Sequence, residues 1–235
     1  MLTAHPIPGK KKSADLCAAF IKGAPASAEG HVFYGVDESN VAAWDAIRSR
    51  GEDWFYLDNS YFDAARGQQF RVTKNRVQHS GEGSSTGERF KALGLKIEPW
   101  VRRPGACRVL CVEQSPSFMR CVAKDEGWLA REAGVWPARW RPWNRDKTAA
   151  GGSLDAALRD PEIFGVLAHS SAALIESLLR GVPVVWCHHA HPAFSVAPWD
   201  SPDDRLRLFS VLADNQFTID ELQDGTAWHA LHLGH

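Results

Sequence analysis

The sequence predicts an α/β protein with Rossmann-like parallel sheets flanked by helices in a two-lobe arrangement. Two observations favour this class. From residue 108 onward, short apolar runs alternate with helical patterns in the order β-α-β-α-β-α-β, and residues 31–58 carry a smaller β-α-β pattern. Right-handed crossovers would make the strands of each unit parallel neighbours. A chain of 235 residues has room for one large domain or two small ones.

The first part of the chain contains the elements of a small lobe. A short helix is expected around Ala14–Ile21, and the apolar run His31–Val36 is typical of a buried strand. Residues 39–50 place three apolar side chains on one helical face, and Trp54–Leu57 predicts the second strand of the β-α-β unit. Phe70–Thr73 predicts a further short strand.

The second part predicts a longer alternation of strands and helices. The expected elements are Arg108–Val112 (strand), 117–133 (helix), Arg139–Trp143 (extended), 153–158 (helix), Ile163–Ala168 (strand), Ser170–Arg180 (helix), Val184–Cys187 (strand), and helices at Asp203–Ala213 and Ile219–Leu222. We place the boundary between the lobes near Pro99–Pro104. Residues 1–103 then form the N-terminal lobe, and residues 104–235 form the C-terminal lobe with a helical tail.

Composition and charge limit the partners and the location of the protein. The formal net charge is -1, so no overall field draws the protein onto nucleic acid or an anionic membrane. No run of eighteen apolar residues occurs, and no signal-like stretch follows Lys10-Lys11-Lys12, so we expect no membrane span. Five cysteines without a close pairing motif suit reduced thiols, and we expect a cytoplasmic protein.

The turn after the strand Ile163–Ala168 predicts a nucleotide-binding site. Ser170 and Ser171 stand where the next helix begins, so backbone N–H groups, the helix dipole and two small hydroxyl side chains favour an anion there. Glu176 follows roughly one and a half turns later, where a carboxylate can accept hydrogen bonds from ribose hydroxyls. The alternative is structural, with Ser170 an ordinary N-cap and Glu176 a solvated helix residue.

The run LAHSSAALIESLLRGVPVV at residues 167–185 resembles the nucleotide-binding unit in the C-terminal lobe of GT-B-fold glycosyltransferases and their sugar-epimerase relatives. The resemblance implies that Ser170 and Ser171, with the preceding His169, form the donor-binding turn. It also implies that Glu176 binds the ribose. The N-terminal lobe would then be the acceptor side.

A second resemblance to the same group lies one β-α unit earlier. Arg139-Trp140-Arg141-Pro142 resembles the R-x-R/K-P stretch that precedes the nucleotide-binding unit. The likeness implies that Arg141 offsets charge on the leaving phosphate group. Enzymes of this group are usually much longer, so we expect a reduced GT-B-like two-lobe arrangement here.

Much of the chain also resembles uncharacterised phage and prophage proteins. The similar segments are Tyr56–Phe62, Phe70–Asn75 and Leu212–Trp228. The resemblance implies a phage-encoded protein in the host cytoplasm, whose acceptor is a modified DNA base or a surface glycan. A base inside a duplex would have to be flipped out.

Polar side chains follow the strand Trp54–Leu57, and strand ends of an open α/β sheet face the ligand cleft. Asp58 is a candidate general base for an acceptor hydroxyl, and Asn59 is a candidate for orienting that hydroxyl. The alternative for both is an Asx turn that ends the strand. Arg71 and Lys74 are candidates for binding a phosphate, or else belong to a solvated basic face.

Three histidines, His188, His189 and His191, follow the last strand of the nucleotide-binding unit. Neighbouring residues of an extended segment point to opposite faces, so we expect no metal site. The alternative is that one of them contacts the donor, and their role stays open.

The sequence leaves two functions open. The first is a glycosyltransferase-like enzyme that uses a nucleotide-sugar as substrate and needs neither a cofactor nor a metal. The second is a non-catalytic accessory protein that binds a nucleotide, nucleic acid or a host protein on the same fold. A cleft with Asp58 or Asp37 opposite Ser170 would favour the enzyme. A cleft filled by Trp140 or by the C-terminal tail would favour the binding protein.

Overall fold

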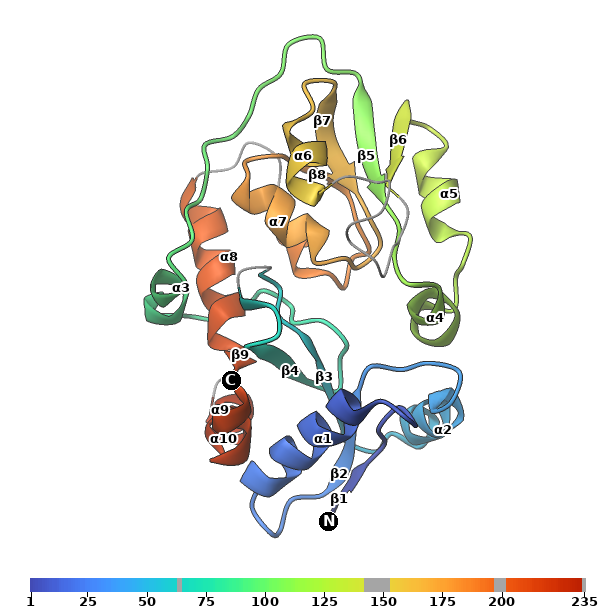
Figure 1. Cartoon of the computed structure of the whole chain (residues 1–235), viewed down its shortest axis with the longest axis vertical. Helices are drawn as coiled ribbons and strands as arrows, with labels where there is room; N and C mark the ends of the chain where they lie inside the picture. The colour runs from blue at the N-terminus through green and yellow to red at the C-terminus, as the bar shows by residue number, and fades with distance from the viewer. Residues whose placement is uncertain (63–64, 142–152, 197–201, 234–235) are drawn as a thin grey trace.

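The computed structural model describes residues 1–62, 65–141, 153–196 and 202–233 and contains two sheets, each covered by helices (Figure 1). One sheet has five strands and the other has four. They belong to two lobes that lie one above the other along the long axis of the molecule. The predicted α/β class with Rossmann-like sheets is confirmed.

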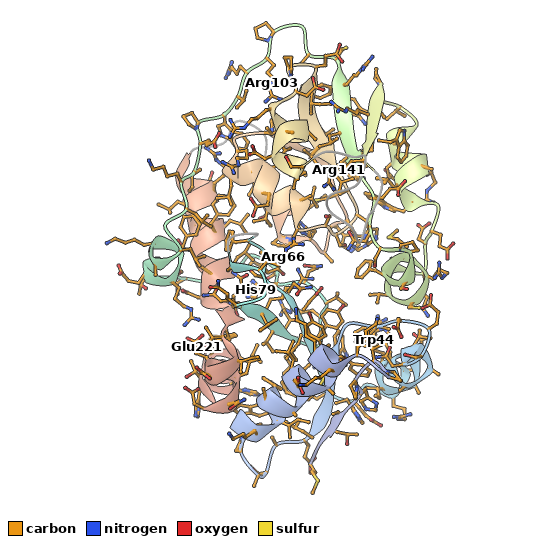
Figure 2. All side chains as sticks on the ribbon, viewed as in Figure 1. Trp44, Arg66, His79, Arg103, Arg141 and Glu221 are labelled. Carbon is orange, nitrogen blue, oxygen red and sulfur yellow. The ribbon has the colours of Figure 1, made fainter. Side chains whose placement is uncertain are left out.

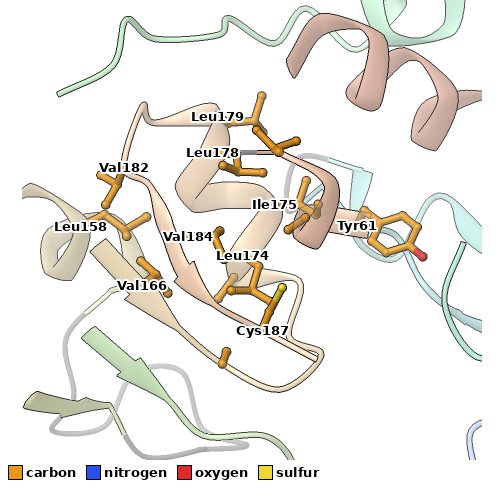
Figure 3. Packing of buried hydrophobic residues seen from close by; sticks show 14 of the residues in the cluster. Tyr61, Leu158, Val166, Leu174, Ile175, Leu178, Leu179, Val182, Val184 and Cys187 are labelled. Carbon is orange, nitrogen blue, oxygen red and sulfur yellow. The ribbon is translucent and has the colours of Figure 1, made fainter. Parts of the chain in front are cut away.

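The C-terminal lobe contains an all-parallel sheet. Its strands are, in spatial order, β6 (Ala138–Arg141), β5 (Arg108–Val112), β7 (Ile163–Leu167) and β8 (Val184–Trp186). Its helical segments are α4 (Pro116–Phe118), a π-helical turn at Met119–Ala123, α5 (Trp128–Ala133), α6 (Leu154–Arg159), α7 (Ala173–Leu179) and a 3₁₀ turn at Pro192–Ser195. Leu174 and Leu178 of α7 belong to the same buried cluster as Val166 of β7 and Val184 of β8 (Figure 3). The extended segment expected at Arg139–Trp143 is a strand as far as Arg141, and its last two residues lie outside the described ranges.

The helix predicted over residues 117–133 is broken into three pieces. Ser115 caps its start, with Oγ accepting a hydrogen bond of 3.2 Å from the Phe118 backbone N–H. The helix then widens into the π-helical turn and stops at Lys124, whose φ of 56° is left-handed. Helix α5 begins only after Gly127. The prediction of one continuous helix was wrong because apolar spacing does not reveal a left-handed residue.

The N-terminal lobe contains a mixed sheet. Its strands are, in spatial order, β1 (Leu2–Ala4), β2 (Gly30–Tyr34), β3 (Trp54–Asn59), β4 (Phe70–Lys74) and β9 (Gln216–Phe217). β1, β2 and β3 are parallel, and α1 (Lys11–Gly23) and α2 (Val41–Arg50) connect them. β4 is antiparallel to β3 and to β9, so the N-terminal sheet is not the purely parallel one that the sequence predicts. The connection between β3 and β4 is too short for a crossover helix, which parallel neighbours require.

The chain returns to the N-terminal lobe at its C-terminal end. The remaining helices are α3 (Glu88–Ala92), α8 (Pro202–Asp214), α9 (Ile219–Gln223) and α10 (Thr226–Leu233). α8 lies beside α3, and α9 and α10 pack against α1 (Figure 1). Phe217, Leu222 and Ala227 are buried in the core beneath α1. The structure therefore departs from the assignment of residues 104–235 to a single lobe, because the last part of the chain covers the apolar face of α1.

The link between the lobes is held by backbone hydrogen bonds at the expected boundary. The Glu98 N–H donates to the Leu179 carbonyl oxygen and the Val101 N–H to the Gly181 carbonyl oxygen, both at 2.8 Å. Gly181 ends α7 with a φ of +66°, and a Cβ at this position would lie 2.0 Å from the Pro99 carbonyl oxygen. Only glycine therefore allows this close approach of the link to α7.

Helix α8 carries a buried arginine that contacts both the link and α7. Arg205 is 1% exposed, and its Nη1 donates to the carbonyl oxygens of Glu98 at 2.9 Å and Leu178 at 2.8 Å. Its guanidinium lies 4.1 Å from the centre of the Trp100 ring. Arg205 therefore joins three segments that are far apart in the sequence.

We predict that the C-terminal segment is essential to the stability of the N-terminal lobe. Leu222 is fully buried, and Leu222→Ala should lower the free energy of unfolding by about 2–5 kcal/mol because it leaves a cavity beneath α1. Urea denaturation followed by tryptophan fluorescence measures this change. Ile219 lies on the same helix but is 41% exposed, so Ile219→Ala should cost less than about 1 kcal/mol. Equal losses in the two variants would contradict the packing of α9 on α1.

Candidate functional site

A cleft of about 480 Å³ lies between the two lobes at the carboxyl ends of their strands. The segments that line it include 35–37 after β2, 58–60 at the end of β3, 113–118 after β5 and 170–172 after β7. Parallel strands direct their carboxyl ends to one edge of a sheet, and each sheet turns this edge toward the cleft. Loops of both lobes can therefore contact one ligand.

Polar contacts join the two lobes beside the cleft. The Glu38 carboxylate accepts a hydrogen bond of 3.2 Å from the Ser117 hydroxyl and forms an ion pair with Arg120. Lys124 Nζ lies 2.8 Å from Asp45 Oδ2. The side chains of both ion pairs are about half exposed, and exposed ion pairs contribute little to stability. The lobes are therefore joined weakly on this side.

Ser170 and Ser171 lie on the upper wall of the cleft. Helix α7 begins at Ala173 rather than at the serines, and Ser171 Oγ accepts a hydrogen bond of 3.2 Å from the Ala173 N–H. Ser170 is 5% exposed, and its carbonyl oxygen accepts a hydrogen bond of 3.4 Å from Gln78 Nε2. Because α7 has only seven residues, its dipole is small. An anion at this wall would therefore be bound mainly by the two hydroxyl groups.

His169 lies directly behind the upper wall. Its Nδ1 is 2.6 Å from the Ser170 hydroxyl oxygen, and its ring stacks on His188 with centroids 4.6 Å apart. Burial, and then the neighbouring His188, lower the pKa of His169 to about 4. The ring is therefore neutral at pH 7. It can share a hydrogen bond with Ser170, but it does not bind a phosphate as a cation.

An adjoining pocket of about 260 Å³ shares Glu113, Gln114 and Pro116 with the cleft. Its apolar lining consists of Val112, Met119, Leu129, Ala130 and Trp140. Trp140 is 47% exposed. Gln114 Oε1 is buried and has no hydrogen-bond partner among the described residues. Glu113, Glu126 and His169 also line the pocket, so a planar ligand that carries N–H groups would meet both apolar faces and hydrogen-bond acceptors there.

Asp58, Asn59 and Arg71 form a connected network on the lower wall. Asp58 Oδ2 lies 2.5 Å from Arg71 Nη2, and Asp58 Oδ1 accepts a hydrogen bond of 2.7 Å from the Asn59 N–H. Asn59 Oδ1 accepts hydrogen bonds from Lys12 Nζ at 2.9 Å and from the Tyr34 hydroxyl at 3.0 Å. Asp58 and Asn59 are therefore held in fixed orientations.

Arg71 and Lys74 lie at opposite ends of β4. Because β4 is antiparallel to β3, Arg71 pairs with Asp58 at the cleft, whereas Lys74 pairs with Phe55 near the other end of the sheet. Lys74 Nζ forms an ion pair of 2.6 Å with Asp53 there. The structure separates Lys74 from the cleft, contrary to our expectation of a shared phosphate site, because the spacing of residues does not reveal strand direction.

Glu176 and Arg141 also lie outside the lining of the cleft. Glu176 is half-buried on α7, and the pKa of Arg180 is raised, first by a hydrogen bond to Glu98 and to a lesser degree by the charge of Glu176. Arg141 is the last residue of β6, and its carbonyl oxygen accepts a hydrogen bond of 3.1 Å from the Glu113 N–H. The ribose contact expected of Glu176 and the phosphate contact expected of Arg141 stay predictions, and neither side chain belongs to the described lining of the cleft.

Several cleft residues were missed by sequence reasoning as site residues. Lys10 and Arg66 lie on the lower wall, and Glu113 and Gln114 lie on the upper wall (Figure 2 shows Arg66 between the lobes). Asp37, predicted from the sequence as an alternative to Asp58, lines the cleft too, with Oδ2 3.0 Å from Lys10 Nζ. Glu113 and Gln114 directly follow a strand, so the rule that we applied after β3 could have found them. Lys10 and Arg66 lie in segments that show no periodic pattern.

The histidines after β8 lie close together. The rings of His188 and His189 have centroids 4.1 Å apart, and the buried His191 accepts a hydrogen bond of 3.2 Å at Nδ1 from the Ala193 N–H. Burial, and then the charge of Arg71, hold the pKa of His191 well below its usual value. Within the described ranges, no group of three His, Cys, Asp or Glu side chains is placed to hold a metal ion.

No protein-family model and no curated protein matches the chain. In the part of the chain that the structure describes, none of the helices has the length and apolar character to cross a membrane. The functional conclusion therefore rests on the two-lobed α/β fold and on the cleft.

We predict that acid destabilises the protein partly through His169. An unfolded histidine binds a proton below pH 6.5, whereas folded His169 does so only below about 4. The unfolded state therefore binds more protons between these values, so the free energy of unfolding should fall as the pH drops from 6.5 to 4 and stay level above 6.5. The full contribution of His169 is about 3 kcal/mol.

Urea denaturation of the wild type and of His169→Phe, from about pH 4 to about pH 8, measures this contribution. Phenylalanine keeps an aromatic ring but has no titrating nitrogen. Other groups titrate in both proteins, so the difference between them isolates His169. Relative to the variant, the wild type should lose stability toward acid. A difference that does not change with pH would contradict the low pKa.

Proposed function

We propose that the protein is a reduced, glycosyltransferase-like enzyme that transfers a sugar from a nucleotide-sugar donor to an acceptor in the cleft. The observation that carries the proposal is the position of Asp58 and Asn59 on one wall of the cleft and of Ser170 and Ser171 on the other. Ligands of open α/β sheets bind at the carboxyl ends of the strands, and both sheets contribute here. The described lining of the cleft includes neither Trp140 nor any residue of the C-terminal helices α9 and α10.

The upper wall suits the donor. The hydroxyls of Ser170 and Ser171 donate hydrogen bonds to the phosphates, and the adjoining pocket takes the base beside Trp140. The unused Gln114 Oε1 accepts a hydrogen bond from an N–H of the base. The proposal gives no role to Glu176, because this side chain is not part of the lining.

The lower wall suits the acceptor and the chemical step. Asp58 takes the proton of the acceptor hydroxyl while the hydroxyl oxygen bonds to the anomeric carbon of the sugar. The bond between that carbon and the phosphate oxygen breaks, and its electron pair leaves with the nucleotide. Arg71 holds Asp58 in place at 2.5 Å. Lys10 and Arg66 line the same cleft and offset the charge that develops on the leaving group.

One observation favours the alternative of a binding protein without turnover. Both oxygens of Asp58 already have partners, Arg71 and the Asn59 N–H. A carboxylate in such a network is well placed to bind and orient a ligand. To accept a proton, it must weaken one of its existing hydrogen bonds. The two functions are separated by whether a bound donor is ever cleaved.

We predict that a donor nucleotide stabilises the protein through the upper wall. A uridine, guanosine, cytidine or adenosine nucleotide at about 100 times its Kd should stabilise the fold by about 2.7 kcal/mol, which raises the Tm in thermal denaturation. Ser171→Asp should abolish the rise by charge repulsion, while its carboxylate can still accept the Ala173 N–H. Ser84→Asp, at an exposed position outside the cleft lining, should keep it. No rise with any nucleotide in folded wild type would sink the donor site.

We predict that Asp58 carries the chemical step. Asp58→Asn should slow hydrolysis of the nucleotide-sugar, with water as the acceptor, by about 10²–10⁴-fold and leave the nucleotide-induced rise in Tm unchanged. Release of free nucleotide measures the rate. Asp53→Asn is the matched control, because Asp53 pairs with Lys74 away from the cleft. Wild type that binds the nucleotide-sugar but never releases nucleotide would be the accessory protein instead.

A further inference from the structure

Helix α1 begins with charges that its own dipole disfavours. Lys10 is the N-cap residue, and Lys11 and Lys12 are the first two residues of this 13-residue helix. The first turn contains no acidic residue, and no side chain of the described residues caps it. The N-terminal end of a helix carries a partial positive charge that favours anions and repels cations. A negative charge from outside the helix would offset the repulsion between these three lysines and the helix dipole.

The start of α1 lies at the lower wall of the cleft. Lys10 lines the cleft, and its Nζ is 3.0 Å from Asp37 Oδ2. Lys12 Nζ donates to Asn59 Oδ1, at 2.9 Å, and Asn59 is itself part of the lining. The three lysines at the start of α1 therefore border the space in which a ligand would bind.

Arg71 is a second, independent observation at the same wall. Its side chain is 6% exposed, its Nη2 pairs with Asp58, and its guanidinium lies 4.6 Å from the centre of the Tyr61 ring. Its Nε is buried and has no hydrogen-bond partner among the described residues. Arg71 lines the cleft, so a ligand can reach its side chain. A buried donor without an acceptor is costly, and a bound anion would satisfy it.

The carboxylates of the lower wall are already in use. Asp37 pairs with Lys10, and Asp58 pairs with Arg71. The hydrogen-bond acceptor of Lys12 Nζ is a neutral amide oxygen. Within the described ranges, Lys12 therefore has no ion-pair partner of its own. The Asp58 carboxylate is near enough to raise the pKa of Lys12, against the larger, lowering effect of burial.

We propose that the start of α1, with Lys12 and Arg71, binds a phosphate group of the acceptor. The proposal rests on the proposed function, in which the acceptor lies on the lower wall beside Asp58. Phosphate oxygens accept hydrogen bonds from first-turn N–H groups, from an ammonium and from a guanidinium, and several oxygens can do so at once. The acceptor is therefore a phosphate ester rather than a neutral glycan.

Calorimetric titration at low salt tests the site with three probes: inorganic phosphate, thymidine 5′-monophosphate and a short single-stranded oligodeoxynucleotide. Lys12 is exposed, so Lys12→Gln should fold normally and weaken binding of the phosphate probes by about 5–10-fold. Lys74→Gln is the matched control on the same sheet and should bind like the wild type. Nucleoside diphosphate, the probe for the upper wall, should bind Lys12→Gln like the wild type.

The three probes distinguish the sources of the phosphate. Tighter binding of the oligonucleotide, with a salt dependence that falls by about one unit of slope in Lys12→Gln, would identify a phosphodiester of nucleic acid. Equal binding of the monophosphate would identify a small phosphate ester. Both results support the proposal.

Three results would overturn it. They are no binding of any probe to the wild type, equal effects of Lys12→Gln and Lys74→Gln, and loss of phosphate binding in Ser171→Asp but not in Lys12→Gln. If the donor nucleotide binds but no phosphate probe binds at the lower wall, the proposed class of acceptor is wrong and the proposed transferase function is unaffected. Phosphate binding through Lys12 without any donor binding overturns the transferase and, with it, the acceptor role of this wall.

Discussion

The return of the C-terminal segment to the N-terminal lobe is the constraint on which the rest of the structure depends. β9 pairs with β4, and Leu222 is buried in the core beneath α1. Just before this, α8 contributes Phe209 and Leu212 to the core that holds α7. One continuous segment therefore packs into both hydrophobic cores. The contact across the mouth of the cleft is weak by comparison, so the walls are positioned mainly by this segment and by the link at Pro99.

The chemistry of the lower wall follows from the direction of a single strand. Because β4 is antiparallel to β3, Arg71 lies beside Asp58 at the cleft and Lys74 lies at the far end of the sheet. A parallel strand would place the two cations the other way round. Among the described residues that line the opposite wall there is no basic side chain, and this wall presents the hydroxyl groups of Ser170 and Ser171. Under the proposed function, the two walls serve different parts of the reaction: uncharged groups of the upper wall bind the donor, and charged groups of the lower wall contact the acceptor.

Sequence reasoning recovered what local patterns encode. Apolar runs predicted the strands of the C-terminal lobe, and the caps Ser115 and Ser153 predicted where two of its helices begin. The rule of strand ends placed Asp58 and Ser170 at one cleft. Sequence reasoning failed where position depends on more than a local pattern. The antiparallel direction of β4 follows from its short connection to β3, which spacing within the strand does not reveal, and the packing of α9 depends on α1, about two hundred positions earlier in the chain. The basic start of α1 was noticed only as a targeting feature, since its meaning depends on the residues that fold next to it.

The position of β9 affects how the protein folds during its synthesis. Domains usually fold on the ribosome in the order in which they are made. Here β1 to β4 emerge first, but the strand at their edge and the helices over α1 are translated only after residue 215. The strands of the C-terminal sheet all lie between residues 108 and 186. This sheet can therefore form while the N-terminal lobe is still incomplete. Until residues 216–233 have been made, the apolar face of α1 lacks this cover, and a chain stopped short of residue 216 would present that face to chaperones and proteases.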